Sequence, residues 1–233
     1  MYRALIIDFS KDKKCFFCKS GKTLKFCVTI QDISSGEVYV SSKSCYEKNI
    51  DKFKNKNDNI PNLTKGVIRE NSESQYLSKR FAIERDPSSQ ISNLEYLILR
   101  QEKLSDIDKM KYDGIQDIYE NYKKGLSLTE IENNRLDRFI ETTKKIYPEF
   151  SPMNLQRLYA CVFWLDYAII NTDYKKTQEF LQSILHDYKK YRMISKKQAD
   201  CVSATFERIN NKITKIKDKI PVVKFIIRAN SID

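Results

Sequence analysis

Four of the chain's six cysteines lie in one short N-terminal stretch, CFFCKSGKTLKFCVTIQDISSGEVYVSSKSC. Cys15 and Cys18 form a C-x2-C pair, and Cys27 and Cys45 follow it. The two residues inside such a pair let both thiolates bind one ion, and clustered cysteines in a reducing compartment are more often metal ligands than disulfides. Four thiolates around one ion are typical of a structural Zn²⁺ site. We therefore predict that Cys15, Cys18, Cys27 and Cys45 bind zinc.

The residues between these cysteines predict how the ligands meet. Residues 23–33 alternate between apolar and polar side chains, Ser-Ser-Gly-Glu at 34–37 is typical of a turn, and the chain then returns as a second strand. Ser44 and Glu47 fit a capping box, which predicts a helix that begins at Cys45 and runs to Phe53. The positive end of that helix favours a deprotonated Cys45 thiol.

The order of C-x2-C knuckle, hairpin and helix resembles the treble-clef and zinc-ribbon families of small zinc domains over about residues 13–55. The resemblance rests on Cys15, Cys18 and Cys45. The chain departs from these families at Cys27, because treble clefs usually place a second ligand pair at the hairpin end and helix start, and at Lys19, where glycine is common. Zinc domains of this kind occur in phage and plasmid accessory proteins. The resemblance therefore implies an accessory role and names no activity.

The whole chain predicts an α+β fold with three segments. Residues 1–56 form a zinc-bound hairpin-and-helix module, residues 57–90 are a polar connecting segment with a short helix over 74–84, and residues 91–233 form a mainly helical bundle. Residues 1–9 and 222–227 both have the pattern of strands. We expect these two terminal strands to pair in one sheet.

Several helix starts in the third segment carry sequence signals. Ser127 with Glu130 and Ser195 with Gln198 fit capping boxes, and Ser151 precedes a proline at the first position of an apolar helix. We interpret Trp164 on that helix as a core residue. The same interpretation applies to Cys161 and Cys201.

A heptad pattern marks the last helix. Apolar residues at spacings of four and three predict one continuous helix from Val202 to Ile220 that needs a long apolar partner, either in its own bundle or in a second copy of the chain. Beside this seam runs a basic stripe on the same predicted helix: Arg208, Lys212, Lys215 and Lys219.

The net charge of +11 indicates a polyanionic partner, either nucleic acid or an acidic protein surface. Two basic regions are candidate binding surfaces in addition to the stripe. Lysines flank the knuckle and hairpin, and cations interleave with two tyrosines around residue 190, as in proteins that stack single-stranded bases. The candidate residues are Lys19, Lys22, Lys25, Lys43, Tyr188, Lys189, Lys190, Tyr191, Arg192, Lys196 and Lys197.

Motifs of common enzymes are missing from the sequence. The chain has one histidine, His186, and contains neither G-x-x-x-x-G-K-[ST] nor G-x-G-x-x-G. We therefore predict a non-catalytic nucleic-acid-binding accessory protein, with a protein-binding adaptor or inhibitor as the alternative and a carboxylate-dependent nuclease as the second alternative. The N-terminus lacks the order of a signal peptide and no apolar run approaches a membrane span, which predicts a cytoplasmic protein without a membrane partner, in the host cytoplasm if the chain is phage-encoded.

Overall fold

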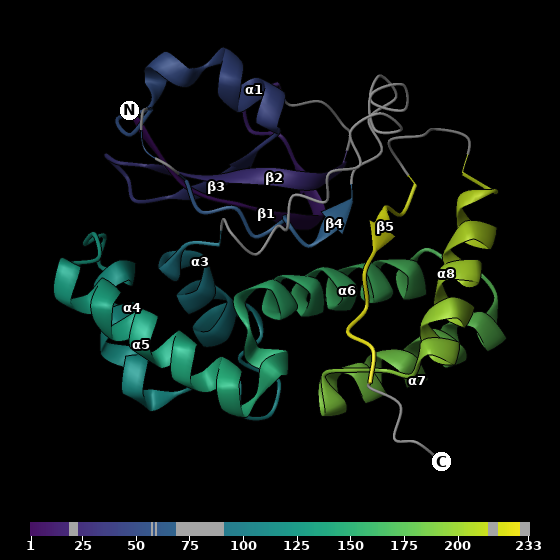
Figure 1. The fold of residues 1–233 in the computed structure, drawn as a ribbon. Helices are drawn as coiled ribbons and strands as arrows, with labels where there is room; N and C mark the ends of the chain where they lie inside the picture. Colours follow the sequence, from purple (N-terminus) through teal and green to yellow (C-terminus); the bar gives the residue numbers. More distant parts are fainter. Residues whose placement is uncertain (19–22, 57, 59, 69–90, 214–218, 229–233) are drawn as a thin grey trace, which may run out of the picture. The chain divides into compact units, whose positions relative to one another are not determined.

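The computed structural model describes residues 1–18, 23–56, 58, 60–68, 91–213 and 219–228. The fold is α+β, as predicted, and the chain divides into two compact units, Met1–Thr64 (the first unit) and Lys65–Asp233 (the second unit). Figure 1 shows the strands of the first unit and the helices of the second. Of the predicted connecting segment, residues 69–90, including the predicted helix over 74–84, lie outside the described residues.

The first unit is built on a three-stranded antiparallel sheet in the order β1-β2-β3. Its strands are β1 (Tyr2–Lys14), β2 (Thr23–Asp32) and β3 (Val38–Ser41). Gly36 in the turn between β2 and β3 has a φ of 75°, which glycine adopts without a steric penalty. The helix α1 (Lys43–Lys48) and the 3-10 helix η1 (Ile50–Lys52) follow. The predicted hairpin is therefore present.

Aromatic rings close the core of the first unit. Val28 and Ile30 on one face of β2 are fully buried, and Tyr46 of α1 and Phe53 pack against them. The Tyr46 and Phe53 rings meet edge to face with their centroids 4.7 Å apart. This packing holds α1 against the sheet, which places its first turn near the end of β1.

The second unit contains most of the helices. Two short strands, β4 (Val67–Ile68) and β5 (Val222–Val223), pair antiparallel. The helical elements between them are α3 (Asn93–Ile98), the π-helix η3 (Leu99–Lys103), η4 (Asp113–Ile115), α4 (Gln116–Lys123), α5 (Glu130–Ile146), η5 (Pro148–Phe150), α6 (Pro152–Ile170), α7 (Lys175–Tyr191) and α8 (Lys196–Asn210).

Helix α6 lies at the centre of the second unit. It packs against α7, η3, η5 and β5, and Figure 1 shows it between the α4–α5 pair and α8. Trp164 and Cys161 on α6 are fully buried, as predicted. Cys201 is exposed, and its interpretation as a core residue is wrong. Helix α8 buries the face that carries Ala199, Val202 and Phe206, and Cys201 lies on the other face.

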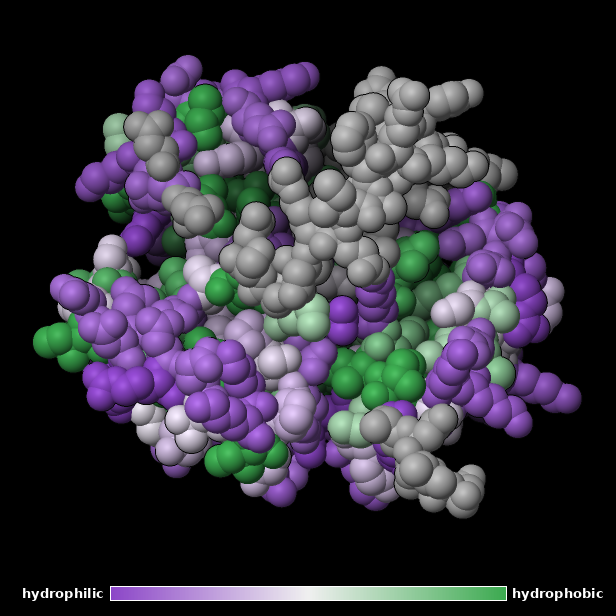
Figure 2. Space-filling view, viewed as in Figure 1, coloured by the Kyte–Doolittle hydropathy of each residue, from purple (hydrophilic) through white to green (hydrophobic). Residues whose placement is uncertain are grey.

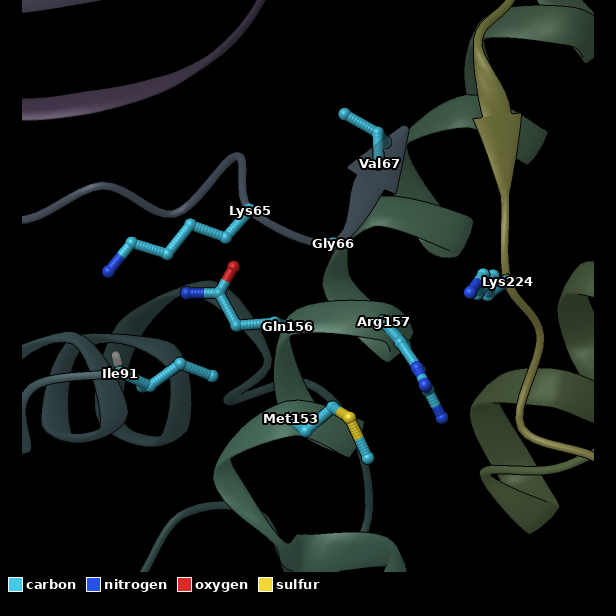
Figure 3. A pocket seen from close by; sticks show the side chains of 8 residues that line it. All are labelled: Lys65, Gly66, Val67, Ile91, Met153, Gln156, Arg157 and Lys224. Atoms are coloured by element: carbon cyan, nitrogen blue, oxygen red, sulfur yellow. The ribbon is translucent and has the colours of Figure 1, made fainter. Parts of the chain in front are cut away.

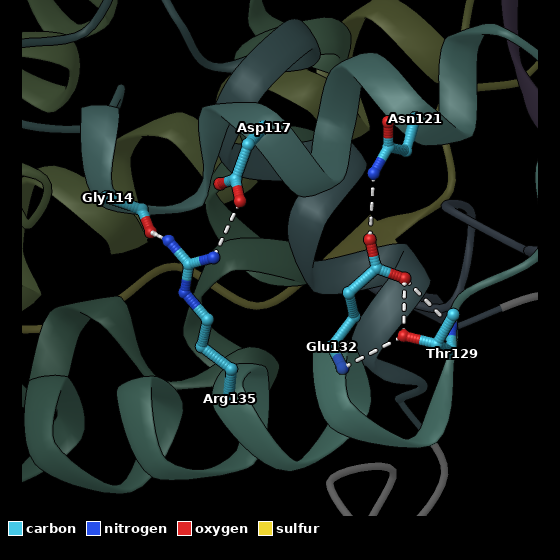
Figure 4. A network of polar contacts seen from close by, with 6 residues as sticks. All are labelled: Gly114, Asp117, Asn121, Thr129, Glu132 and Arg135. Atoms are coloured by element: carbon cyan, nitrogen blue, oxygen red, sulfur yellow. Dashed lines mark hydrogen bonds and ion pairs between the residues drawn. The ribbon is translucent and has the colours of Figure 1, made fainter.

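The N-cap of α5 lies two residues after the predicted position. Thr129, not Ser127, is the N-cap, and its hydroxyl accepts from the Glu132 N–H while the Glu132 carboxylate accepts from the Thr129 N–H. The Glu132 carboxylate also accepts from Asn121 on α4 at 3.0 Å, and Arg135 pairs with Asp117 at 2.6 Å (Figure 4). The contact from Asn121 therefore supports the capping box of Thr129 with Glu132, which is the one that forms. The predicted box of Ser195 with Gln198 on α8 is confirmed.

The prediction of one helix from Val202 to Ile220 is wrong. Helix α8 ends at Asn210, whose side-chain amide donates to the Ile220 carbonyl at 2.9 Å and accepts from the Ile220 N–H at 2.7 Å. The chain after Ile220 then forms β5, which pairs with β4, whereas β1 pairs with β2. The predicted pairing of the two terminal strands is therefore wrong as well.

Hydrophilic side chains cover most of the α4–α5 region on the face drawn in Figure 2. Single apolar side chains interrupt this surface. Ile131 near the start of α5, for example, is 80% exposed. None of the helices in the described part of the chain combines the length and apolar content that crossing a bilayer requires.

Candidate metal centre

Three of the four predicted ligands meet in the first unit. The Sγ atoms of Cys15, Cys18 and Cys45 all lie within 4.8 Å of one another. Cys15 is buried, Cys45 is partly buried and Cys18 is exposed, so the cluster reaches from the interior to the surface. Three thiols at this separation are close enough to bind one metal ion.

Ser42 connects the two parts of the chain that carry the thiols. Its backbone N–H donates to the Cys15 Sγ at 3.3 Å, and its hydroxyl accepts from the Cys45 N–H at 3.2 Å as the N-cap of α1. The predicted capping box of Ser44 with Glu47 is therefore wrong, because Ser42, two residues earlier, is the N-cap. The sequence did contain a signal for Ser42 as the N-cap, because serine is favoured at the position just before the first residue of a helix.

The backbone of the C-x2-C segment is fixed to the sheet. The Phe16 N–H donates to the Val40 carbonyl of β3 at 2.9 Å, and the Phe16 ring stacks on Tyr39 with centroids 4.3 Å apart. Because β3 leads directly into α1, these contacts hold the pair of thiols and the third thiol in one place. The hairpin thus performs the task that the sequence predicted for it.

Hydrogen bonding divides the thiols by acidity. Burial raises the pKa of Cys15, but N–H donors from Cys18 and Ser42 outweigh it and lower that pKa to about 6. The Ser42 hydroxyl lowers the pKa of Cys45, yet burial and the neighbouring Cys15 and Cys18 sulfurs raise it overall. One thiolate therefore opposes the formation of a second. A bound cation would remove this repulsion, since metal ligands must be deprotonated.

Cys27 does not belong to the cluster, and its prediction as a fourth ligand is wrong for this structure. Cys27 lies inside β2, opposite Asp8 of β1, and is 3% exposed. Neighbouring side chains on a strand point to opposite faces, so Cys27 points away from the face on which Val28 packs against α1. The alternation of side chains between the two faces of β2 separates Cys27 from the other thiols. The number of residues between cysteines does not reveal this alternation.

The structure describes two of the four lysines predicted around the knuckle, and these two differ in exposure. Lys19 and Lys22 lie outside the described residues. Lys43 is exposed and lies 3.8 Å from Glu47 on the same helix. Lys25 lies on β2 and is partly buried.

The predicted cations near residue 190 are partly engaged within the second unit. Lys189 pairs with Asp106 at 2.7 Å, and Arg192 lies 3.6 Å from Glu149. Lys190, at the end of α7, lies over the Tyr191 ring at 5.1 Å. Lys196 and Lys197 are exposed in the first turn of α8.

Tyr188 is not a stacking platform. Its side chain is fully buried, and its hydroxyl accepts from the Ile226 N–H at 3.1 Å. The Phe225 ring packs against it edge to face, with centroids 5.5 Å apart. Tyr191, three residues later, is 43% exposed, and the Arg228 guanidinium lies over its ring, 5.4 Å from the centroid.

The predicted basic stripe does not lie on one helix. Arg208 is exposed on α8, but Lys212 and Lys219 come after the end of that helix, and Lys215 lies outside the described residues. The Lys212 ammonium lies over the Tyr174 ring, 3.9 Å from its centroid. The three described cations, Arg208, Lys212 and Lys219, therefore do not share the helical ridge that the heptad pattern predicted.

Comparison of the chain with protein-family models, with curated proteins and with solved structures found no match. The cysteine cluster is compatible with a small metal site, and the resemblance to treble clefs remains a prediction.

Proposed function

We propose that Cys15, Cys18 and Cys45 bind one Zn²⁺ ion that stabilises the first unit. The observation that carries this proposal is the mutual approach of their sulfurs to within 4.8 Å. Thiolates are soft ligands that favour zinc among the abundant divalent ions, and three of them supply three of the four positions of a tetrahedral site. Because the Ser42 and Cys18 N–H groups already donate to Cys15, the chain stabilises the charged form of that ligand.

Native mass spectrometry of the intact protein tests the zinc proposal. We expect one zinc ion per chain in the wild type and its loss in the variant Cys18→Ser, which changes an exposed ligand. The matched control is Cys201→Ser, since Cys201 is also exposed and lies on α8. Equal zinc content in the two variants, or a metal-free wild type, would contradict the proposal.

We further propose that the protein binds nucleic acid without catalysing a reaction on it. Supporting this proposal are the net charge of +11 and the exposed lysines at the end of α7 and the start of α8, namely Lys190, Lys196 and Lys197. Cations on a surface bind phosphates mainly by releasing counterions, so affinity falls steeply as salt rises. Tyr191 adds a 43% exposed aromatic side chain between Lys190 and Arg228, and a base can stack on its ring if one of these cations moves aside.

Fluorescence anisotropy with a labelled single-stranded oligonucleotide tests this second proposal. Changing Lys190, Lys196 and Lys197 together to Gln should weaken binding and reduce the slope of log affinity against log salt by roughly 0.7 for each lost phosphate contact. Replacing Lys175, Lys176 and Lys144 by Gln gives a control with the same change in charge. Equal losses in both triple variants would indicate only a general effect of charge, and undetectable binding at low salt would overturn the proposal.

A further inference from the structure

A pocket in the second unit is lined by residues that are far apart in the sequence. Its empty volume is about 500 Å³, open solvent included. Gly66 and Val67 of the β4 segment form one wall, α6 contributes Gln156 and Arg157, and Lys224 follows β5. Figure 3 shows Arg157 and Lys224 toward one side of the pocket and the Lys65 and Gln156 side chains toward the other.

Arg157 differs from two other arginines that are at least partly buried in this unit. Arg100 donates to the Met110 carbonyl at 2.7 Å and to the Lys109 carbonyl at 2.9 Å, and Arg192 lies 3.6 Å from the Glu149 carboxylate. In the part of the chain that the structure describes, no hydrogen bond or ion pair engages the partly buried Arg157 guanidinium. The guanidinium is therefore free to donate hydrogen bonds to an acceptor from outside the chain.

The charges around the pocket are not balanced. Lys65 pairs with Glu95 at 2.8 Å, so its charge is largely compensated. Arg157 and Lys224 remain as cations, and no Asp or Glu is among the described residues that line the pocket. Ile91 and Met153 add an apolar rim. The pocket thus combines a planar guanidinium and an exposed ammonium with a surface for an uncharged group.

We propose that this pocket binds a phosphate monoester, with the phosphate on Arg157 and Lys224 and the attached group against Ile91 and Met153. A phosphate dianion carries several acceptor oxygens and close to two charges, which matches two separate cations better than a single carboxylate does. The terminal phosphate of an oligonucleotide and the phosphate of a free nucleotide share this chemistry. The site is independent of the lysines proposed above to bind the nucleic-acid backbone.

Gly66 determines how closely the β4 segment approaches α6. A Cβ atom at this position would lie 2.2 Å from the Gln156 carbonyl oxygen and 3.0 Å from the Ala160 Cβ. Only a glycine fits at such a distance, so this wall of the pocket depends on the absence of a side chain at position 66. This close contact fixes the backbone of β4 beside the part of α6 that carries Arg157.

Isothermal titration calorimetry on the intact protein tests the proposal, with AMP as the phosphate monoester and adenosine as the same group without phosphate. We expect AMP to bind at least about tenfold more tightly than adenosine, and Arg157→Gln to remove most of that difference. Lys224→Gln should weaken AMP by a smaller factor. The control Lys196→Gln removes one charge outside the pocket and should leave AMP binding unchanged.

A second comparison identifies the source of the phosphate. If nucleic acid supplies it, an oligonucleotide with a 5′-phosphate binds about tenfold more tightly than its 5′-hydroxyl form, and Arg157→Gln abolishes the difference. If free nucleotides supply it, only AMP shows dependence on Arg157. Either outcome supports the phosphate site, and Arg157→Lys, which keeps the charge, should recover part of the binding. The proposal is overturned if Arg157→Gln and Lys196→Gln behave alike toward AMP and both oligonucleotides while circular dichroism shows both variants to be folded.

Discussion

The first and second units bring reactive side chains together by different routes. In the first unit, one hairpin and one helix turn gather Cys15, Cys18 and Cys45, which lie close in the sequence. In the second unit, the pocket needs three distant segments that carry Gly66, Arg157 and Lys224. A local arrangement leaves a spacing that the sequence displays, whereas an arrangement made by long-range packing does not. A motif search would therefore find the first site and miss the second.

Removing the proposed zinc ion should give the largest effect and should destabilise the first unit without destabilising the second. Apparent zinc-binding free energies in small structural sites are about 10–16 kcal/mol, and much of this is folding free energy. We expect chelation, or Cys45→Ser, to abolish the protection of α1 and β3 in hydrogen-exchange mass spectrometry while α6 and α7 keep theirs. Unchanged exchange in α1 after chelation would contradict a role of the metal in holding the first unit.

Replacing one glycine by alanine in each unit compares how tightly the backbone is packed at the two positions. Gly66→Ala forces a contact with the Gln156 carbonyl oxygen and should lower the free energy of unfolding by about 1–3 kcal/mol. Gly36→Ala meets no atom within 4 Å, so only its φ of 75° is penalised, at roughly 1 kcal/mol. Urea unfolding measures both. A larger loss at Gly36 would mean that β4 readily moves away from α6.

Alanine replacements at the two candidate caps of α5 should separate the sequence signal from the observed helix start. Thr129→Ala removes the observed cap and should cost about 1 kcal/mol in unfolding free energy. Ser127→Ala, at the position that the sequence pattern favoured, should change that free energy by less than about 0.5 kcal/mol. Thermal unfolding followed by circular dichroism distinguishes the two. The reverse order would restore the capping box of Ser127 with Glu130.

The smallest expected effect is a dependence of stability on the charge of Glu132. Hydrogen bonds from the Thr129 N–H, the Asn121 amide and the Thr129 hydroxyl lower the pKa of this exposed carboxyl. A carboxyl with a lowered folded-state pKa stabilises the protein above its unfolded pKa, and this stabilisation is lost as the pH falls through the folded-state value. Glu132→Gln should therefore be less stable than the wild type near neutral pH, and the difference should shrink on acidification.

Urea unfolding across the acidic range measures the Glu132 effect, with Glu130→Gln in the same helix turn as the control. A difference between Glu132→Gln and the wild type that stays constant down to low pH would show that the carboxylate charge is not its cause.

Local signals in the sequence predicted much of the fold. Three predictions are confirmed: the hairpin, the start of α6 at its proline, and the burial of Trp164. Each depends on residues that are neighbours along the chain or that share one helix face. Helix starts were displaced by two residues where a second serine or threonine stood nearby, and the contacts of Asn121 and Ser42 decide between the alternatives.

The wrong predictions involve partners that spacing cannot supply. The Asn210 amide binds the backbone of Ile220, and this contact accompanies the end of α8 where the heptad pattern continues. For Cys27, the spacing of the cysteines is compatible with a fourth ligand, but it does not show on which face of β2 the thiol lies. Arg157 carried no signal at all, because its significance arises only when β4 and β5 are beside α6.

The position of the chain's single tryptophan has a practical consequence. Trp164 is fully buried on α6, in the second unit, so fluorescence excited selectively at tryptophan reports the folding of that unit and not of the first. Cobalt bound at the proposed zinc site would give thiolate charge-transfer absorption from the first unit alone. The two optical signals would therefore follow the two units independently in a single sample.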